Sequence, residues 1–186
     1  MAYKYDLFIS YTWRVPRAQR WVRGVLFEPL CDFLELEAGI PKQRVFLDER
    51  EVRPGEHVQP VVHRALLSSK VMLAVLSPQY VQSGWCLTEF HTMRHRATAT
   101  GARVLHPIAV WDGDLYPHEA RALGPQDFNQ WGTLDRGMRR KRWTDTAKAL
   151  AIELGQLVRQ APEHDAAWQI DVHDDPPPVH IPRGGF

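Results

Sequence analysis

A tryptophan and a glutamate one helical turn apart are the residues of this chain whose types and spacing best suit chemistry. Trp85 and Glu89 stand four positions apart in the segment SGWCLTE, residues 83–89, so on a helix both side chains lie on one face. An aromatic ring beside a single carboxylate can hold a nucleotide and stabilise a sugar cation. The alternative is a packing tryptophan beside a solvated helix charge, and the rest of the chain decides between them.

The elements that must position this pair follow an α/β pattern. Near-continuous apolar runs predict strands buried on both faces of a parallel sheet, and segments with helical spacing lie between them. Strands are predicted at residues 5–10, 44–48, 70–76 and 103–110, and helices at about 17–37, 56–69, 83–100 and 144–160. Pro29 should kink or split the first helix, and Pro107 places the fourth strand near a sheet edge or at a bulge. This order predicts a flavodoxin-like, doubly wound sheet of about five strands with helices on both faces.

Such a sheet has a predictable place for a ligand. In the flavodoxin-like strand order, the crevice opens where the first and third strands diverge, beyond their C-terminal ends. The first strand leads into residues 10–13 and the third into residues 77–85, the two loops richest in aromatic and hydroxyl side chains. Glu89 projects from the start of the helix that follows the third strand. These groups should therefore converge on one site.

Length and composition exclude several classes of protein. The chain has 186 residues, of which 44% are hydrophobic and 24% are charged, and these values suit one globular domain with a tail. The net charge of +1 gives no reason to expect a nucleic-acid or membrane partner. The first residues lack the apolar stretch expected of a signal peptide, and no run approaches the ~18 apolar residues of a membrane span. Two cysteines suggest a reducing compartment, so the expectation is a cytoplasmic protein. The absence of GxxxxGK[ST] and GxGxxG argues against a nucleotidase or dehydrogenase.

Three segments together resemble the TIR (Toll/interleukin-1 receptor) domain family. Residues 5–11 (YDLFISY) are similar to its opening box, residues 46–56 (FLDEREVRPGE) to its second strand and BB loop, and residues 77–89 to the segment running into its catalytic helix. The match keeps the family's order from about residue 4 to residue 160. The predicted organisation is a TIR domain over residues 1–160 and a proline-rich tail over residues 161–186.

The resemblance implies one of two functional classes. Receptor and adaptor members are non-catalytic modules of homotypic TIR assembly, whereas many bacterial, plant and axonal members cleave NAD+ at the nicotinamide–ribose bond. The enzymatic members carry a glutamate where Glu89 stands, and the presence of Trp85 and Cys86 beside it favours the enzyme. The expected products are nicotinamide with ADP-ribose, or with a cyclic or conjugated ADP-ribose messenger, in bacterial antiviral immunity. NAD+ is then the substrate, and neither a cofactor nor a metal is expected.

A single carboxylate suits this reaction. Ordinary glycosidases need two carboxyl groups, one of which assists the leaving oxygen, but nicotinamide leaves NAD+ as a neutral molecule without acid assistance. An ionised Glu89 would stabilise the ribosyl cation and hold the ribose hydroxyls, and Trp85 would form a stacking or shape-selective wall.

The resemblance also implies a set of substrate-binding residues. They are Ser10, Tyr11, Trp13, Arg14, Asp48, His57 and Trp85. Tyr11 falls where the family lines its nicotinamide pocket. Trp13 stands where other members often carry a basic residue, so Arg14 is the substitute expected to meet the pyrophosphate. Asp48 has an alternative interpretation as a turn-capping carboxylate.

The BB loop, residues 48–57, carries a prediction about assembly. Pro54 and Gly55 fit the central positions of a type II turn in a loop of mixed charge. In enzymatic members this loop packs onto a neighbouring subunit and completes the active site there. We therefore expect a homo-oligomer, or assembly with a separate sensor or effector protein, and poor activity of the monomer.

Two further features leave alternatives open. His91 and His95 have a spacing that zinc sites use, but no third ligand stands at a convincing spacing, and no metal site is predicted. In the tail, Trp168, Ile170 and Val172 alternate with polar residues as in a short edge strand. The prolines at 176–178 favour a polyproline conformation that a partner could bind, and disorder explains the tail equally well.

Overall fold

The computed structural model describes residues 2–13, 15–47, 58–111, 116, 118–132 and 140–173. Its centre is a five-stranded sheet in the order β2-β1-β3-β4-β5, in which every pairing is parallel. The strands are β1 (Tyr5–Tyr11), β2 (Val45–Leu47), β3 (Ser69–Leu76), β4 (Leu105–Ala109) and β5 (Gln126–Asp127). The predicted flavodoxin-like order, with its switch point between β1 and β3, is confirmed.

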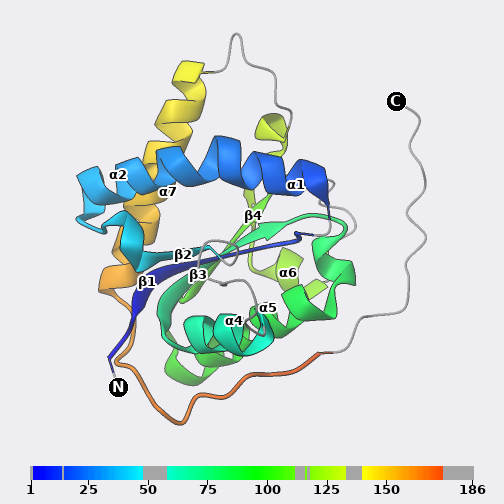
Figure 1. The fold of residues 1–186 in the computed structure, drawn as a ribbon, viewed down its shortest axis with the longest axis vertical. Coiled ribbons are helices and arrows are strands. Elements are labelled where there is room, and N and C mark those ends of the chain that lie inside the picture. Colours follow the sequence, from blue (N-terminus) through cyan, green and yellow to red (C-terminus); the bar gives the residue numbers. More distant parts are fainter. Residues whose placement is uncertain are drawn as a thin grey trace.

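Helices cover both faces of the sheet (Figure 1). One layer holds α1 (Pro16–Trp21), a π-helix (Val22–Phe27), α2 (Glu28–Ala38) and α7 (Arg140–Arg159); the other holds α4 (Val58–Leu67), α5 (Gly84–Thr100) and α6 (His118–Ala122). Within the described residues, 3-10 turns lie at Lys42–Arg44, Tyr80–Gln82 and Asn129–Trp131. Among the described helices, none is both long and apolar enough to cross a membrane.

Both prolines stand at irregular points of the fold. Pro29 stands in the first turn of α2, directly after the π-helix. A proline lacks the N–H of an α-helical bond and its ring crowds the preceding turn, and the turn that precedes Pro29 is the π-helix. On the other side of the molecule, β5 pairs only with Ile108 and Ala109 of β4. Pro107 therefore belongs to the part of β4 that pairs with no described residue of β5.

The continuous apolar run of β1 is explained by burial on both faces. All seven residues of β1 are buried. Leu7, Ile9 and Tyr11 pack into the core beneath α2 and α7, whereas Phe8 packs into the core beneath α4 and α5 and stacks on Phe46 of β2, with ring centroids 5.1 Å apart. Because side chains alternate along a strand, β1 sends successive residues to opposite cores.

The tail follows a course that corrects the expectation of an edge strand. Residues 161–173 form no strand and lie along α5, where Figure 1 shows the orange segment beneath the lower layer of helices. The Arg96 guanidinium carbon lies 3.9 Å from the centroid of the Trp168 ring, and Ile170 packs against the core beneath α4 and α5. Burial lowers the pKa of Arg96 to about 10. The alternation in the tail therefore serves packing on a helix, not pairing in a sheet.

Asp6 links β1 to β3 and to the turn before β2, at the end of the sheet where these strands begin. Its carboxylate accepts hydrogen bonds from Arg44 Nε at 2.9 Å and Nη2 at 3.0 Å, and Lys70 Nζ lies 2.8 Å away. Burial alone would raise the pKa of Asp6, but the bonds and charges of Arg44 and Lys70 hold it below its ordinary value. A lowered carboxyl pKa stabilises the fold above the pKa of the unfolded chain, and this stabilisation is lost as the pH falls through the folded value.

We expect Asp6→Asn to lower the free energy of unfolding by about 2 kcal/mol at pH 7, because it removes charged hydrogen bonds and leaves two cations unpaired. The difference from the unsubstituted chain should shrink as the pH falls below about 4. Urea unfolding across this pH range measures it, with Asp32→Asn on the exposed surface of α2 as the control. A difference that stays constant down to low pH would contradict the assigned role.

Candidate active site

The loop between β3 and α5 fixes where Glu89 stands. Tyr80 donates its backbone N–H to the Ser77 carbonyl at 3.0 Å and to Ser77 Oγ at 3.1 Å, which closes a buried turn after β3. Ser83 then caps α5, since its side chain accepts a hydrogen bond from the backbone N–H of Cys86 at 3.4 Å. Glu89 follows on the second turn of the helix, beside the C-terminal end of β1.

Both oxygens of the Glu89 carboxylate accept hydrogen bonds from side chains of the protein. The indole Nε1 of Trp85 donates to Oε1 at 2.7 Å, and Ser10 Oγ donates to Oε2 at 2.5 Å. Glu89 is 3% exposed, so it is a buried carboxyl group whose two oxygens are both hydrogen-bonded. The structure thus brings together three residues that the sequence nominated, and the predicted shared face of Trp85 and Glu89 is confirmed.

Tyr80 extends this arrangement and was not nominated from the sequence. Its hydroxyl lies 2.7 Å from Ser10 Oγ. Because the Ser10 hydrogen is donated to Glu89, Ser10 must accept from Tyr80. Burial, together with the nearby Cys86 and Glu89, raises the pKa of Tyr80 well above its ordinary value, which keeps the phenol protonated as this donor. We refer to Ser10, Tyr80, Trp85 and Glu89 as the Glu89 cluster.

Trp85, which donates to the Glu89 carboxylate, also contacts helix α4. Its ring stacks on the imidazole of His63, with centroids 5.6 Å apart and planes at 28°. Burial lowers the pKa of His63, so the imidazole against the indole is neutral at pH 7. The expectation that Trp85 forms a wall for the substrate remains a prediction. The hydrogen bond from its indole N–H to Glu89 was not predicted from the spacing. His63 also escaped the sequence analysis, because a lone histidine on a helix gives no signal.

The other nominated residues separate into two groups. Tyr11 is buried in the core beneath α2 and α7, on the face of β1 opposite Ser10, so its side chain lies apart from the Glu89 cluster, and its assignment to the substrate site stays a prediction. Trp13 follows β1 and is 50% exposed. Arg14, Asp48, His57 and the BB loop, residues 48–57, lie outside the described residues, and their assignments stay predictions.

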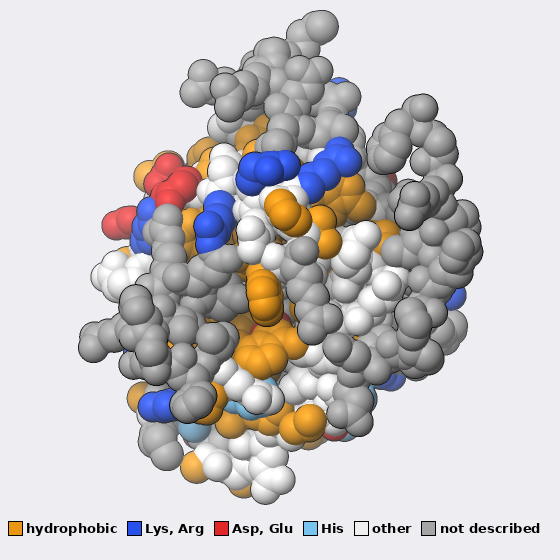
Figure 2. Space-filling model, turned by 45° about the vertical axis from the view of Figure 1, so that its right-hand side comes forward, with side chains coloured by type: hydrophobic (Ala, Val, Ile, Leu, Met, Phe, Trp, Pro, Cys, Tyr) orange, Lys and Arg blue, Asp and Glu red, His pale blue; other side chains and the backbone are white. Residues whose placement is uncertain are grey.

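The surface at the C-terminal ends of the strands is hollowed. Figure 2 shows this face, with hydrophobic side chains lining a depression in its middle and Lys and Arg side chains beside the rim. A buried carboxylate at such a place can stabilise positive charge that develops on a ligand, because fixed charges act strongly where water is excluded. Lys and Arg at the rim suit a ligand that carries phosphate groups.

Comparison with known proteins identifies similar chains. A family model described as TIR domain matches residues 7–151. The TIR domain of the Toll-related receptor TRR-2 from Hydra magnipapillata has a similar fold, with a TM-score of 0.52 and 18% identity over 79% of this chain and 98% of that domain.

Two proteins that are similar in sequence are named for different functions, one as a receptor and one as a synthase. Toll-like receptor 4 of Homo sapiens is 29% identical over 87 residues, which are 46% of this chain and 9% of the receptor. A protein of Brachypodium distachyon, named as probable 2' cyclic ADP-D-ribose synthase BdTIR, is 28% identical over 121 residues, or 61% of this chain and 50% of the plant protein. The chain therefore matches half or less of the length of each of these relatives.

Proposed function

Because this chain belongs to the TIR domain family, we propose that it cleaves NAD+ at the nicotinamide–ribose bond with Glu89 as the catalytic carboxylate. One observation carries the proposal: the Glu89 carboxylate is buried at the switch point of the sheet, where Ser10 and Trp85 fix its two oxygens. The similarity to a plant protein named as a probable cyclic ADP-ribose synthase supports it.

The bond that breaks joins C1' of the ribose to the ring nitrogen of nicotinamide. The electron pair leaves with nicotinamide, which becomes neutral, and the ribose becomes an oxocarbenium cation. Glu89 would offset this positive charge and accept hydrogen bonds from the ribose hydroxyls, since a carboxylate has about four acceptor sites. Because Ser10 and Trp85 hold the carboxylate in place, little reorganisation is required as the charge develops.

The nucleophile that captures the cation determines the product. Water gives ADP-ribose, whereas a hydroxyl or ring nitrogen of the same molecule, or of a second one, gives a cyclic or conjugated ADP-ribose. With Glu89 only 3% exposed, the site favours exclusion of water. We therefore propose a cyclic or conjugated product, acting as a messenger in bacterial antiviral immunity, and expect ADP-ribose as the competing product of hydrolysis.

A non-catalytic role is the second candidate, because part of the chain is similar to Toll-like receptor 4. TIR domains of receptors act by homotypic assembly. A module of this kind would assemble without consuming NAD+, so the two candidates differ in whether nicotinamide is released once the chain has assembled.

The proposed enzyme should be activated by its own concentration. Glu89 is covered in the single chain, and the BB loop of a neighbouring copy is expected to complete the site. In the range where few molecules are assembled, mass action should make the rate of nicotinamide release rise as about the square of the protein concentration. Chromatography of the products over a concentration series, with and without a crowding agent, measures this rate and names the product.

The same series separates the alternatives. A rate that is strictly proportional to protein concentration would contradict activation by assembly and leave a catalytic monomer. No release at any concentration, although light scattering shows that the chain assembles, would contradict catalysis and support the non-catalytic module.

A further inference from the structure

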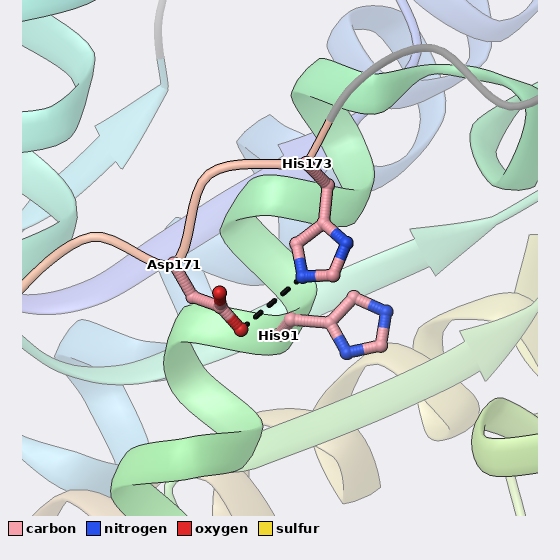
Figure 3. A group of neighbouring side chains, drawn as sticks. All are labelled: His91, Asp171 and His173. Carbon is pink, nitrogen blue, oxygen red and sulfur yellow. Dashed lines mark hydrogen bonds and ion pairs between the residues drawn. The ribbon is translucent and has the colours of Figure 1, made fainter.

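The tail brings two side chains onto α5 beside a histidine of that helix. His91 of α5 and Asp171 and His173 of the tail each offer one ligand atom, and these atoms all lie within 4.8 Å of one another. Figure 3 shows the Asp171 carboxylate hydrogen-bonded to the His173 imidazole, with the His91 imidazole beside them at the surface of α5. We propose that these three residues bind a Zn²⁺ ion that fastens the tail to α5.

The backbone that carries the two tail ligands is already fixed to the helix. The N–H of Asp171 donates to Thr92 Oγ1 at 2.9 Å, and the N–H of His173 donates to Thr88 Oγ1 at 2.8 Å. In an extended segment, residues two apart point to the same side, so both ligands face α5 on the same side as His91. The backbone of both ligands therefore loses most of its conformational entropy when the tail packs on α5, before a metal binds.

The ligand atoms are close enough together for a small tetrahedral ion once the two imidazoles, which stack in the structure, turn their nitrogens toward it. Asp171 Oδ2 lies 3.2 Å from His173 Nε2, and the rings of His91 and His173 stack with centroids 4.1 Å apart. Zinc bonds of about 2.0–2.1 Å in a tetrahedron place ligand atoms roughly 3.3 Å apart. Because these atoms all lie within 4.8 Å of one another, no pair has to approach by more than about 1.5 Å, which rotation of half-buried side chains supplies.

His95, one helical turn beyond His91, is the residue that could supply a fourth ligand. His95 Nδ1 lies 3.2 Å from Asp171 Oδ2, and the His95 side chain is 70% exposed, so its ring can turn toward an ion without disturbing the core. The donor set is then three imidazoles and one carboxylate. Imidazole favours zinc over the hard cations Mg²⁺ and Ca²⁺, which prefer oxygen ligands alone.

Binding would couple the tail to the helix of the candidate active site. Thr88, which holds His173, is the residue before Glu89, and Thr92 lies one turn beyond it. An ion that binds only when the tail lies on α5 stabilises that arrangement by mass action. This role does not require the chain to cleave NAD+, so it stands or falls separately from the proposed function.

Zn²⁺ titration of the full, tag-free chain against a chromogenic chelator tests the proposal. We expect one equivalent of Zn²⁺ to bind, and each of His91→Gln, Asp171→Asn and His173→Gln to weaken binding at least ~100-fold, since even the loss of a group that only orients a ligand costs 10–100-fold. His164→Gln is the matched control, because His164 lies in the same tail but packs on Tyr3 and Trp168.

A second measurement does not depend on the chelator. Zn²⁺ should raise the midpoint of thermal unfolding of the unsubstituted chain and of His164→Gln, and leave the three ligand variants unchanged. Co²⁺ in place of Zn²⁺ should give the visible absorption of a tetrahedral site. Stoichiometric binding that the ligand variants retain, or no stoichiometric binding by the unsubstituted chain, would overturn the proposal.

Discussion

Substituting glutamine for Glu89 should reduce the rate of nicotinamide release from NAD+ by about 10²–10³-fold, the effect of removing a principal electrostatic group from an active site. Glutamine has nearly the same shape, and its carbonyl oxygen can still accept one of the two hydrogen bonds from Ser10 and Trp85. It carries no charge to offset the ribosyl cation. The loss should therefore fall on kcat, measured as initial rates at a concentration where the unsubstituted chain is assembled.

Glu35→Gln provides the matched control for this experiment. Glu35 lies on the exposed side of α2, in the layer on the other face of the sheet, so the same chemical change there should leave the rate unaltered. Thermal unfolding and light scattering of both variants report whether fold and assembly are retained. If Glu89→Gln kept its rate within about threefold of the unsubstituted chain, Glu89 would not be the catalytic carboxylate.

The fold was predictable wherever it follows from the periodic pattern of hydrophobic residues or from the connection rules of α/β sheets. The buried run of β1 and the apolar run of β3 fixed two parallel strands, and the alternation with helices predicted the order of the sheet, which is confirmed. Residues 126–127 of β5 are two exposed polar residues and give no such signal. The course of residues 161–173 depends on contacts with α5 such as that of Trp168 with Arg96, which no local pattern encodes.

The candidate site was predictable in part, for the same physical reason. Trp85 and Glu89 share one helix, so their spacing fixes their relation, and the topology of the sheet brings Ser10 to them. The participation of Tyr80 depends on the path of the turn after β3, which composition does not determine. The separation of the Tyr11 and Ser10 side chains could have been read from the sequence, because the period of a strand alone places neighbouring residues on opposite faces.

The cluster at His91 shows the same limit at longer range. Its spacing to His95 was visible in the sequence, but the remaining ligands, Asp171 and His173, arrive on a segment that is distant along the chain. A metal site whose ligands come from separate elements needs the tertiary structure to appear. The same is true of the pair formed by His63 and Trp85.

Trp85→Phe isolates the contribution of the indole N–H. Phenylalanine keeps an aromatic ring against His63 but cannot donate to Glu89 Oε1. A hydrogen bond to a charged group contributes about 1.5–3 kcal/mol, so we expect kcat to fall roughly 10- to 100-fold while KM changes little, since the bond positions the carboxylate and does not contact the substrate. Steady-state kinetics at saturating assembly measure the split between the two constants.

Trp143→Phe is the control for this substitution, because Trp143 is a half-buried indole on α7 that packs against Trp21 and Trp131 on the other face of the sheet. It should cost some stability and leave kcat unchanged. An unchanged kcat in Trp85→Phe would mean that Trp85 only packs.

The double variant Trp85→Phe with Glu89→Gln decides how the two residues act. Residues that act as a unit give losses that do not add, so if the indole works only by holding the carboxylate, the double variant should be no slower than Glu89→Gln alone. A further loss beyond that of Glu89→Gln would instead show that the Trp85 ring contacts the substrate itself, which is the role as a wall that the sequence suggested. The comparison therefore separates positioning of the carboxylate from binding of the nucleotide with variants that change no backbone atom.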